Sequence, residues 1–268
     1  MVRFLLLNIV LFTLLLRADE GLSVEFVPAK KLVPLFAASG PEHRVSYAKH
    51  LTSGTFSGSM GGSLPAADVR AFGLLCQLSA GGSVHTTLRN AGAKFSVTNV
   101  DFVVDVTFDV PVSDATIVRT GWGHTSHHLA DDAMSAGLTP NNYARDYYAL
   151  YGVHALPFAD TRVYAGVQYS YSFLINTRMD GQWMPHLGGE GTFLRVWSGA
   201  ALYGAFDLKF RGELEYGSTQ SFQVGLKAQS PLNRTLRLAY TFRTGLEERG
   251  QFYDRRETTH TIGLFFDL

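Results

Sequence analysis

The sequence has few cysteines, no excess of basic residues and no long apolar run after its first residues, so it lacks the features of a disulfide-bonded, nucleic-acid-binding or helical membrane protein. Among 268 residues there is one cysteine, Cys76, so neither a disulfide nor a cysteine-based metal site can form within one chain. Charged residues make up only 17% of the chain, and 23 basic side chains balance 23 acidic ones, which excludes a broad basic face for nucleic acid. After residue 16, no apolar run approaches the roughly 18 residues of a membrane-spanning helix.

Aromatic residues and glycine, in contrast, are plentiful. Phe, Tyr and Trp make up 13% of the chain, and 27 residues are glycine. A hydrophobic fraction of 46% is ordinary for a folded protein and argues against disorder. Because aromatic side chains favour strands, a chain that is rich in them and poor in charge is expected to consist mostly of β structure.

The first residues have the composition of a secretory signal peptide. Arg3 supplies a positive start, residues 4–16 form a largely apolar run, and the small Ala18 suits the cleavage position. A membrane anchor or a buried helix is the alternative, but the run is shorter than the roughly 20 residues that span a bilayer. We therefore expect residues 1–18 to be a signal peptide for the Sec pathway. Residues 19–268 are expected to form one domain, because no linker or charge block divides them.

Polar and apolar residues alternate along most of the remaining chain. In the clearest stretch, residues 202–216, Phe206 and Phe210 lie on one face and Lys209 lies on the other. A period of two over such a length is the pattern of a long β-strand. The same period recurs at 95–110, 163–173, 233–244 and 259–268. Turn-forming sequences lie between these segments, at 80–82, 90–92, 112–114, 159–160, 180–181, 216–218 and 231–233.

The two faces of these strands differ in a way that indicates a membrane barrel. One face is aliphatic and aromatic and the other is ionised, as expected for lipid outside and a polar lumen inside. Closure satisfies every backbone group in hydrocarbon, whereas a soluble β-sandwich has shorter strands. We predict an all-β fold, a transmembrane antiparallel up-and-down β-barrel of about 12 strands, with ten as the neighbouring even number. The last strand carries Phe266 and Leu268 on its apolar face, an ending suited to the barrel assembly machinery.

Charged residues predicted to face the lumen are expected to pair with one another and to obstruct so narrow a barrel. They are Asp101, Asp105, Lys209, Arg211, Glu213, Arg237 and Arg243.

Several ordered segments resemble a bacterial outer-membrane family, the domain of unknown function 1207 family. The most specific is Gly123–Asp132, followed by the element Asn142–Arg145. The other matching segments are 35–38, 44–47, 162–166, 205–209 and 250–253. Within the first segment, His127, Ala130 and Asp132 depart from the family's usual serine, glycine and glutamate. The resemblance implies a barrel in the outer membrane of a Gram-negative envelope and no particular activity.

One constellation could carry chemistry. On a strand, His124 and Ser126 share a face about 6.6 Å apart, within reach of an imidazole that turns toward a hydroxyl. A histidine beside a serine is the minimal base–nucleophile pair and needs a third group to orient the imidazole. The candidates for that group are Asp131, Asp132 and Asn142. The His-x-Ser spacing is similar to that of two outer-membrane lipid hydrolases, a phospholipase A barrel and a lipid A deacylase barrel.

Three functions therefore stay open. The first is a structural or lipid-associated barrel, in which the histidines belong to a hydrogen-bonded network, with phospholipid and lipopolysaccharide as its lipid partners. The second is a serine-type esterase of membrane lipid, and the third is a small-solute channel. A divalent cation is also conceivable as a cofactor, since His127 and His128 lie close to other imidazole and carboxylate ligands, although the spacing matches no zinc signature.

Overall fold

Strands make up most of the structure, a computed structural model that describes residues 21–175, 182–197, 199–230 and 234–268. The predicted signal peptide, residues 1–18, lies outside the described residues. The strands are β1 (Ser23–Phe26), β2 (Val45–His50), β3 (Thr55–Ala71), β4 (Leu74–Ala91), β5 (Lys94–Pro111), β6 (Thr116–Leu129), β7 (Tyr143–Ala155), β8 (Arg162–Ile175), β9 (Trp183–Trp197), β10 (Ala200–Arg211), β11 (Gly217–Gln229), β12 (Thr235–Leu246) and β13 (Arg256–Asp267). The connections include the short helices α2 (Asp131–Ser135), η1 (Gly212–Leu214) and η2 (Gly250–Phe252). Within the ranges given above, no helix is both long enough and apolar enough to span a membrane.

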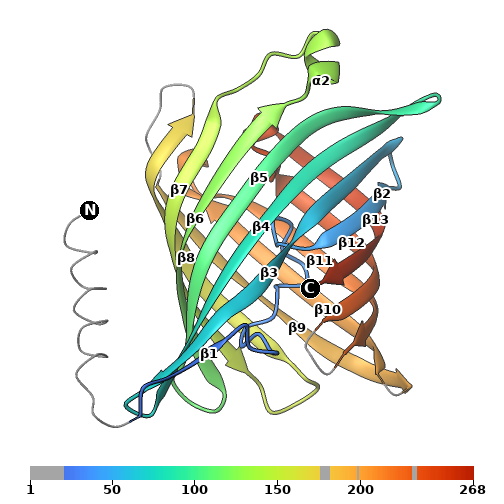
Figure 1. Ribbon diagram of the computed structural model, residues 1–268. Helices are drawn as coiled ribbons and strands as arrows, with labels where there is room; N and C mark the ends of the chain where they lie inside the picture. Colours follow the sequence, from blue (N-terminus) through green and yellow to red (C-terminus); the bar gives the residue numbers. More distant parts are fainter. Residues whose placement is uncertain (1–20, 176–181, 198, 231–233) are drawn as a thin grey trace.

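Twelve of the described strands close into an antiparallel barrel (Figure 1). From β2 to β13 each strand pairs with the next one in sequence, and β13 pairs with β2 to complete the ring. The predicted fold class and strand number are therefore confirmed. The remaining strand, β1, pairs with residues 67–70 of β3 and was not predicted.

The two faces of the barrel wall differ as the alternation predicted. Phe222, Leu238 and Leu264 point outward and are 45%, 49% and 53% exposed, whereas Arg237 points into the lumen and is 2% exposed. Large apolar side chains on the outside of a closed barrel are suited to contact with lipid. The exterior is thus apolar and the interior polar, with one wall separating them.

Each of the predicted lumen charges has a charged or ionisable partner, but only Arg211 and Glu213 pair with one another, and the other five pair with residues outside the predicted set. Buried charges need partners because desolvation is costly. The pairs are Asp101–His127, Asp105–His43, Lys209–Glu248, Arg211–Glu213, Arg237–Asp267 and Arg243–Glu248.

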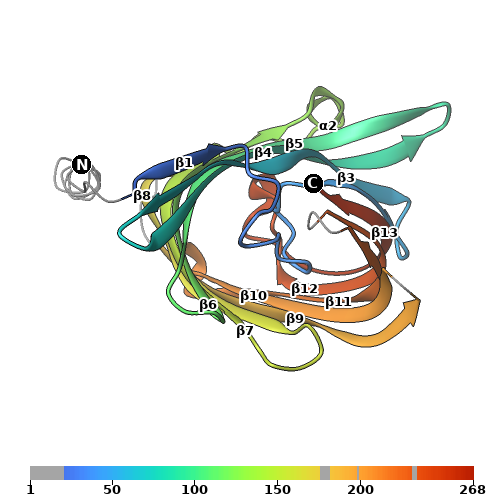
Figure 2. The ribbon, with the colours of Figure 1, turned by 60° about the horizontal axis from the view of Figure 1, so that its bottom comes forward.

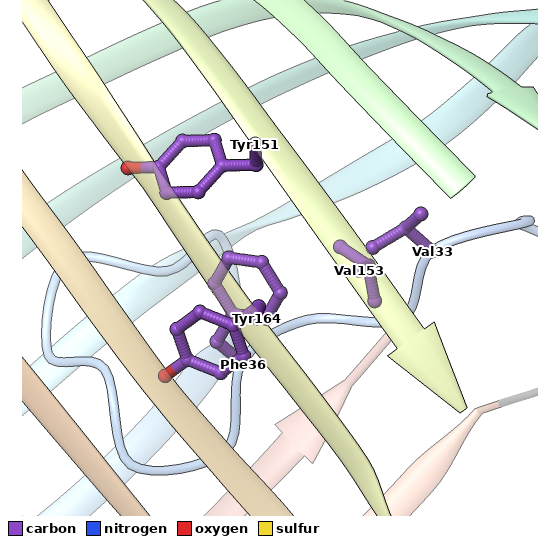
Figure 3. Packing of buried hydrophobic residues seen from close by; sticks show 5 residues of the cluster. All are labelled: Val33, Phe36, Tyr151, Val153 and Tyr164. Carbon is purple, nitrogen blue, oxygen red and sulfur yellow. The ribbon is translucent and has the colours of Figure 1, made fainter. Parts of the chain in front are cut away.

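The chain between β1 and β2 runs through the interior of the barrel, which was not predicted. Figure 2 shows this segment, in blue, inside the ring of strands. We call residues 28–44 the lumen plug. Phe36 of the plug stacks on Tyr164 with ring centroids 3.7 Å apart, and Val33 is fully buried in the same cluster (Figure 3). The barrel therefore has an apolar core within its polar lumen.

Three arginines of the barrel wall, together with Arg44 at the end of the plug itself, bind the main-chain carbonyl oxygens of the plug. Their guanidinium groups donate hydrogen bonds to five consecutive carbonyls, so buried donors and buried acceptors satisfy each other. Arg119 donates to Val33 (3.2 Å), Arg162 to Pro34 (2.9 Å) and Leu35 (2.5 Å), Arg44 to Phe36 (2.7 Å) and Ala37 (2.9 Å), and Arg237 also to Ala37 (3.1 Å). The three wall arginines thus attach the plug to the barrel through its main chain, whereas Arg44 folds back onto the plug itself.

A glycine pair that was predicted to form a turn lies instead in the middle of a strand. Gly81 and Gly82 belong to β4, and the chain turns earlier, at Phe72 and Gly73. A Cβ at Gly81 would collide with the ring of His43 in the plug. This glycine therefore lets the plug approach the wall closely. The sequence alone does not distinguish such a glycine from one in a turn.

The strand predicted over residues 202–216 ends early. β10 stops at Arg211, and η1 follows it before left-handed conformations at Glu215 (φ 55°) and Tyr216 (φ 59°). The carboxylate of Glu213 folds back to lie 2.7 Å from Nε of Arg211. The polar–apolar alternation continued past the strand because this loop residue also faces the lumen.

The two ends of the barrel differ in their connections (Figure 1). At one end, which we call the turn end, the chain reverses at 72–73, 112–115 and 156–161. At the other, which we call the loop end, longer connections at 130–142 and 247–255 carry α2 and η2. The second of these, the mouth loop (residues 247–255), folds into the barrel, where buried Gln251 donates a 2.6 Å hydrogen bond to the carbonyl of His127.

Candidate functional site

The outward face of β6 carries the serine and two of the histidines that the sequence singled out. His124, Ser126 and His128 lie on this face, and the alternating Thr125 and His127 are buried in the lumen. Successive side chains of a strand point to opposite faces, so the predicted shared face is confirmed. His124 and Ser126 therefore face the barrel exterior and not the lumen.

Asp146 supplies the partner of His124. It lies directly opposite His124 in the register of β6 and β7, and its Oδ1 is 2.6 Å from Nδ1 of the imidazole. A carboxylate on Nδ1 fixes the ring and its tautomer, so that Nε2 is the nitrogen that can accept a proton. We did not predict Asp146, although an acidic residue between Ala144 and Tyr148 on an outward face is a signal that the sequence contains.

Ser126 follows His124 by two positions on the same face, about 6.6 Å along the strand. Among the described residues, its hydroxyl makes no hydrogen bond with His124 or with another side chain. The distance is one that rotation of the imidazole can close, and catalytic hydrogen bonds are often long before substrate binds. The three side chains can therefore form a serine–histidine–aspartate arrangement after a side-chain movement.

The three residues that we had considered as orienting groups lie elsewhere. Asp131 and Asp132 begin α2, and Oδ2 of Asp132 accepts a 3.0 Å hydrogen bond from the backbone N–H of Val97. Asn142 is exposed at the end of the same connection. The connection rises above the end of the barrel, whereas a partner for His124 has to come from the strand beside it.

Polar-tipped aromatic side chains mark the depth of the site. Trp122 and Tyr148 form the next outward pair from His124 toward the turn end, and Nε1 of Trp122 donates a 2.7 Å hydrogen bond to the hydroxyl of Tyr171. The rings of Tyr148 and Tyr171 stack with centroids 4.9 Å apart. Such residues concentrate where hydrocarbon meets the polar lipid region. His124 and Ser126 thus lie just on the polar side of an aromatic belt.

The proposed metal ligands do not converge. His127 points into the lumen, with Nδ1 3.0 Å from Asp101, whereas His128 points outward and contacts the ring of Phe102 edge-on. Neighbouring residues on opposite faces of one strand cannot share an ion. In the described part of the chain, no group of three or more His, Cys, Asp or Glu residues is arranged to hold a metal.

A second serine–histidine–aspartate arrangement lies inside the lumen. Oγ of Ser83 is 2.9 Å from Nδ1 of His43, and Nε2 of His43 is 2.9 Å from Asp105. Oγ of Ser83 also lies 2.9 Å from Nε2 of His85. His43 belongs to the plug, and both Ser83 and His43 are buried. This group anchors the plug to β4 and β5 and offers no route for a lipid substrate, which leaves Ser126 as the accessible serine of the two.

Together, the apolar exterior, the plug and the outward polar group define a membrane-spanning β-barrel with an occupied lumen and ionisable residues on its lipid face. No family model matches the chain, and no curated protein matches it. The chain is similar to a solved structure of a KdgM porin, with 12% sequence identity, a TM-score of 0.43, and coverage of 84% of this chain and 99% of that one. Membership of the domain of unknown function 1207 family stays a prediction.

Proposed function

We propose that this protein is an outer-membrane enzyme that hydrolyses an acyl ester of a membrane lipid. Ser126 is the nucleophile, His124 the general base, and Asp146 the residue that orients His124. The observation that carries the proposal is the 2.6 Å contact between His124 and Asp146 on the lipid face of the barrel, beside Ser126. Ionisable side chains on a lipid-facing surface are costly, and where they occur they usually mark a function.

The reaction follows from these positions. His124 Nε2 accepts the proton of the Ser126 hydroxyl as Oγ attacks the ester carbonyl carbon, and the Asp146 carboxylate stabilises the imidazolium that forms. The tetrahedral species collapses when its C–O bond to the glycerol or sugar breaks, and the imidazolium returns the proton to the departing oxygen. A water molecule, deprotonated by His124, then attacks the acyl-serine and releases the fatty acid. Serine and base are thereby regenerated.

The depth of the site favours a lipid substrate. The ester groups of a bilayer lie between its hydrocarbon and its headgroups, at the level where Trp122, Tyr148 and Tyr171 gather. The apolar band continues from there toward the turn end with exposed Phe108 and Leu150, along which an acyl chain can lie. A lipid that diffuses in the membrane thus reaches Ser126 without leaving the bilayer.

Location and orientation complete the proposal. Outer-membrane barrels have short turns on the periplasmic side and longer loops outside, which places the loop end, with α2 and the mouth loop, at the cell surface. His124 and Ser126 lie toward that end, so the substrate is a lipid of the outer leaflet, either phospholipid or lipopolysaccharide. Export through the Sec pathway and assembly by the barrel assembly machinery belong to the same proposal.

The plug argues against the alternative of a small-solute channel. It crosses the lumen, five of its carbonyls are bound to arginines, and the mouth loop covers the loop end. In a barrel of this width, side chains of the wall fill much of the space beside such a segment. We therefore favour a function on the exterior of the barrel.

Release of fatty acid is the direct test. The folded protein is incubated in micelles with phospholipid or lipopolysaccharide, each with and without calcium, and free fatty acid is measured. We expect Ser126→Ala and His124→Ala each to abolish release while heat-modifiable migration on SDS gels is unchanged. Ser83→Ala, which alters the buried lumen serine, is the matched control and should keep activity. Absence of release from every lipid would overturn the proposal and leave a structural barrel.

A further inference from the structure

A cavity of about 570 Å³ opens at the turn end of the lumen, beneath the plug. It is bounded by the plug residues Pro34 and Leu35, by the ends of β8 to β12, and by turn residues such as Asp160 and Ser230. Sites for small organic ligands typically have volumes of about 300–1,000 Å³. Two further lumen cavities, of about 140 and 130 Å³, are too small for more than a few waters. We call the large cavity the turn-end bowl.

Among the charged side chains that line the turn-end bowl, there is one more cation than there are carboxylates. Three arginines in it are paired with three carboxylates: Arg162 with Glu190 (3.0 Å), Arg195 with Asp160 (2.5 Å) and Arg237 with Asp267 (3.0 Å). Lys227 also lines the bowl, and within the described residues its ammonium has no carboxylate within 4.0 Å. The ammonium lies 5.9 Å from the centre of the Tyr203 ring. The bowl therefore has an excess of one positive charge.

Unused hydrogen-bond donors accompany this charge. Among the residues that the structure describes, the hydroxyl of Thr192, which is only 6% exposed, has no hydrogen-bond partner, and the same holds for Nε of Arg162. Both residues line the bowl. Buried donors without acceptors are uncommon in native proteins and often indicate an absent ligand or ordered water. A ligand that brings acceptor oxygens would satisfy both.

The plug supplies a roof without competing acceptors. The carbonyls of Pro34, Leu35 and Ala37, which would repel an anion, already accept hydrogen bonds from Arg162 and Arg237. What these plug residues can still present to the bowl is the apolar surface of their side chains. An anionic group can therefore lie near Lys227 while a less polar body rests against the plug.

We propose that the turn-end bowl binds a small organic anion whose carboxylate, or a similar singly charged acidic group, is held by Lys227. Thr192 and Arg162 donate hydrogen bonds to its oxygens, and the rest of the molecule lies beneath the plug. This site is separate from Ser126, which faces lipid nearer the other end of the barrel. In the proposed orientation the bowl faces the periplasm, so the ligand is a periplasmic solute. An acidic peptide of a periplasmic protein is the competing occupant, but a bowl closed by the plug suits a compact molecule.

Calorimetry of the purified, folded protein in detergent micelles tests this proposal. The probes are pantothenate, a small carboxylate, and panthenol, its neutral alcohol counterpart. We expect saturable binding of pantothenate, weakened by salt, and binding of panthenol at least 10-fold weaker. Lys227→Gln should weaken pantothenate binding at least 10-fold and Thr192→Val several-fold. Lys94→Gln, which removes an exposed charge at the tip of the β4–β5 hairpin, is the matched control.

Three results would overturn the proposal. Equal binding of pantothenate and panthenol would show that the negative charge of the ligand does not determine its affinity. The absence of saturable binding would show that the bowl holds only water. Tight binding of an oligoglutamate peptide without binding of pantothenate would assign the bowl to a protein partner. The comparison of the two probes needs only the unaltered chain, so it decides the question even where Lys227→Gln fails to assemble.

Discussion

Nζ of Lys209 lies 2.5 Å from Oε1 of Glu248, which joins the wall of the barrel to the mouth loop. The same ammonium lies 3.2 Å from Asp207 on its own strand and donates a 3.2 Å hydrogen bond to Ser39 of the plug. One buried cation thus holds three parts of the chain that are far apart in sequence. Glu248 also lies 3.1 Å from Arg243, so the loop is fixed by two strands.

This arrangement makes Lys209→Gln a damaging substitution, which the alternation alone did not indicate. Two buried carboxylates lose their cation, and breaking a buried pair costs about 3–5 kcal/mol. We expect urea denaturation of the vesicle-inserted barrel to show a loss of that order, and the double variant Lys209→Gln with Glu248→Gln to recover part of it. A Lys209→Gln protein as stable as the unaltered chain would contradict the role of this ammonium.

The outer face gives a second prediction. Phe222 lies in the middle of the apolar band, opposite Phe206, and Phe222→Arg places a charge against hydrocarbon at a cost of roughly 2–4 kcal/mol. Gln220→Arg changes the neighbouring outward position nearer the loop end, where the cost falls to about 0–1 kcal/mol. Folding into vesicles, measured by heat-modifiable migration and urea denaturation, should separate the two. Similar losses for both variants would mean that the band does not lie at this height.

The pairing of Asp146 with His124 predicts a loss of turnover without loss of fold. In Asp146→Asn the amide cannot stabilise the imidazolium, and kcat for fatty-acid release should fall by roughly 10²–10⁴-fold, while the melting behaviour stays the same. Asp132→Asn alters a nearby carboxylate that bonds the backbone of Val97 and should leave kcat within a factor of about two. Full activity of Asp146→Asn would exclude this residue from the mechanism.

Closure of the lumen is testable by conductance. In planar bilayers we expect the unaltered barrel to remain closed, because the plug carbonyls are bound by arginines. Arg162→Gln combined with Arg237→Gln removes three of these hydrogen bonds, which frees the carbonyls of Pro34 and Leu35, and should produce frequent openings. Arg195→Gln removes an exposed arginine at the same end and should not change conductance. Steady conductance of the unaltered protein would mean that the plug does not occupy the lumen.

Acid should release the mouth loop. Burial disfavours the charge of Glu248, but Arg243 and Lys209 outweigh it and hold its pKa below the usual 4.5. Burial likewise opposes the charge of Glu247, yet Arg249 lowers the pKa of that carboxyl to about 2. A carboxyl whose pKa is depressed by folding stabilises the folded form above its unfolded pKa and loses this contribution as the pH falls through the folded value.

Hydrogen exchange of residues 247–255 should therefore be slow at pH 7 and become faster, relative to an exposed reference peptide, as the pH falls from 4.5 toward 2. Glu248→Gln should already exchange faster at pH 7 and respond less to acid. Protection that increases as the pH falls would reverse the sign of this linkage and contradict the pairing.

The sequence by itself determined the wall of the barrel. Period-two alternation is a local property, since each strand needs only to present one face to lipid and the other to the lumen. It was sufficient to predict twelve strands, the outward position of Phe206, and the shared face of His124 and Ser126. It also indicated that lumen charges such as Lys209 would be paired, although it could not identify their partners.

The tertiary structure alone decided what lies inside the barrel and what lies across from each strand. The plug has no periodic pattern, because carbonyls bound by Arg162 and Arg237 hold it and not a repeated side-chain face. Gly81 was predicted to lie in a turn. The real reason for a glycine there is the ring of His43, which leaves no space for a Cβ at Gly81 and comes from a segment distant in sequence. Asp146 reaches His124 only through the register of β6 and β7, and register depends on how the whole ring closes. Local chemistry thus fixed the faces of the strands, and closure of the ring fixed their partners.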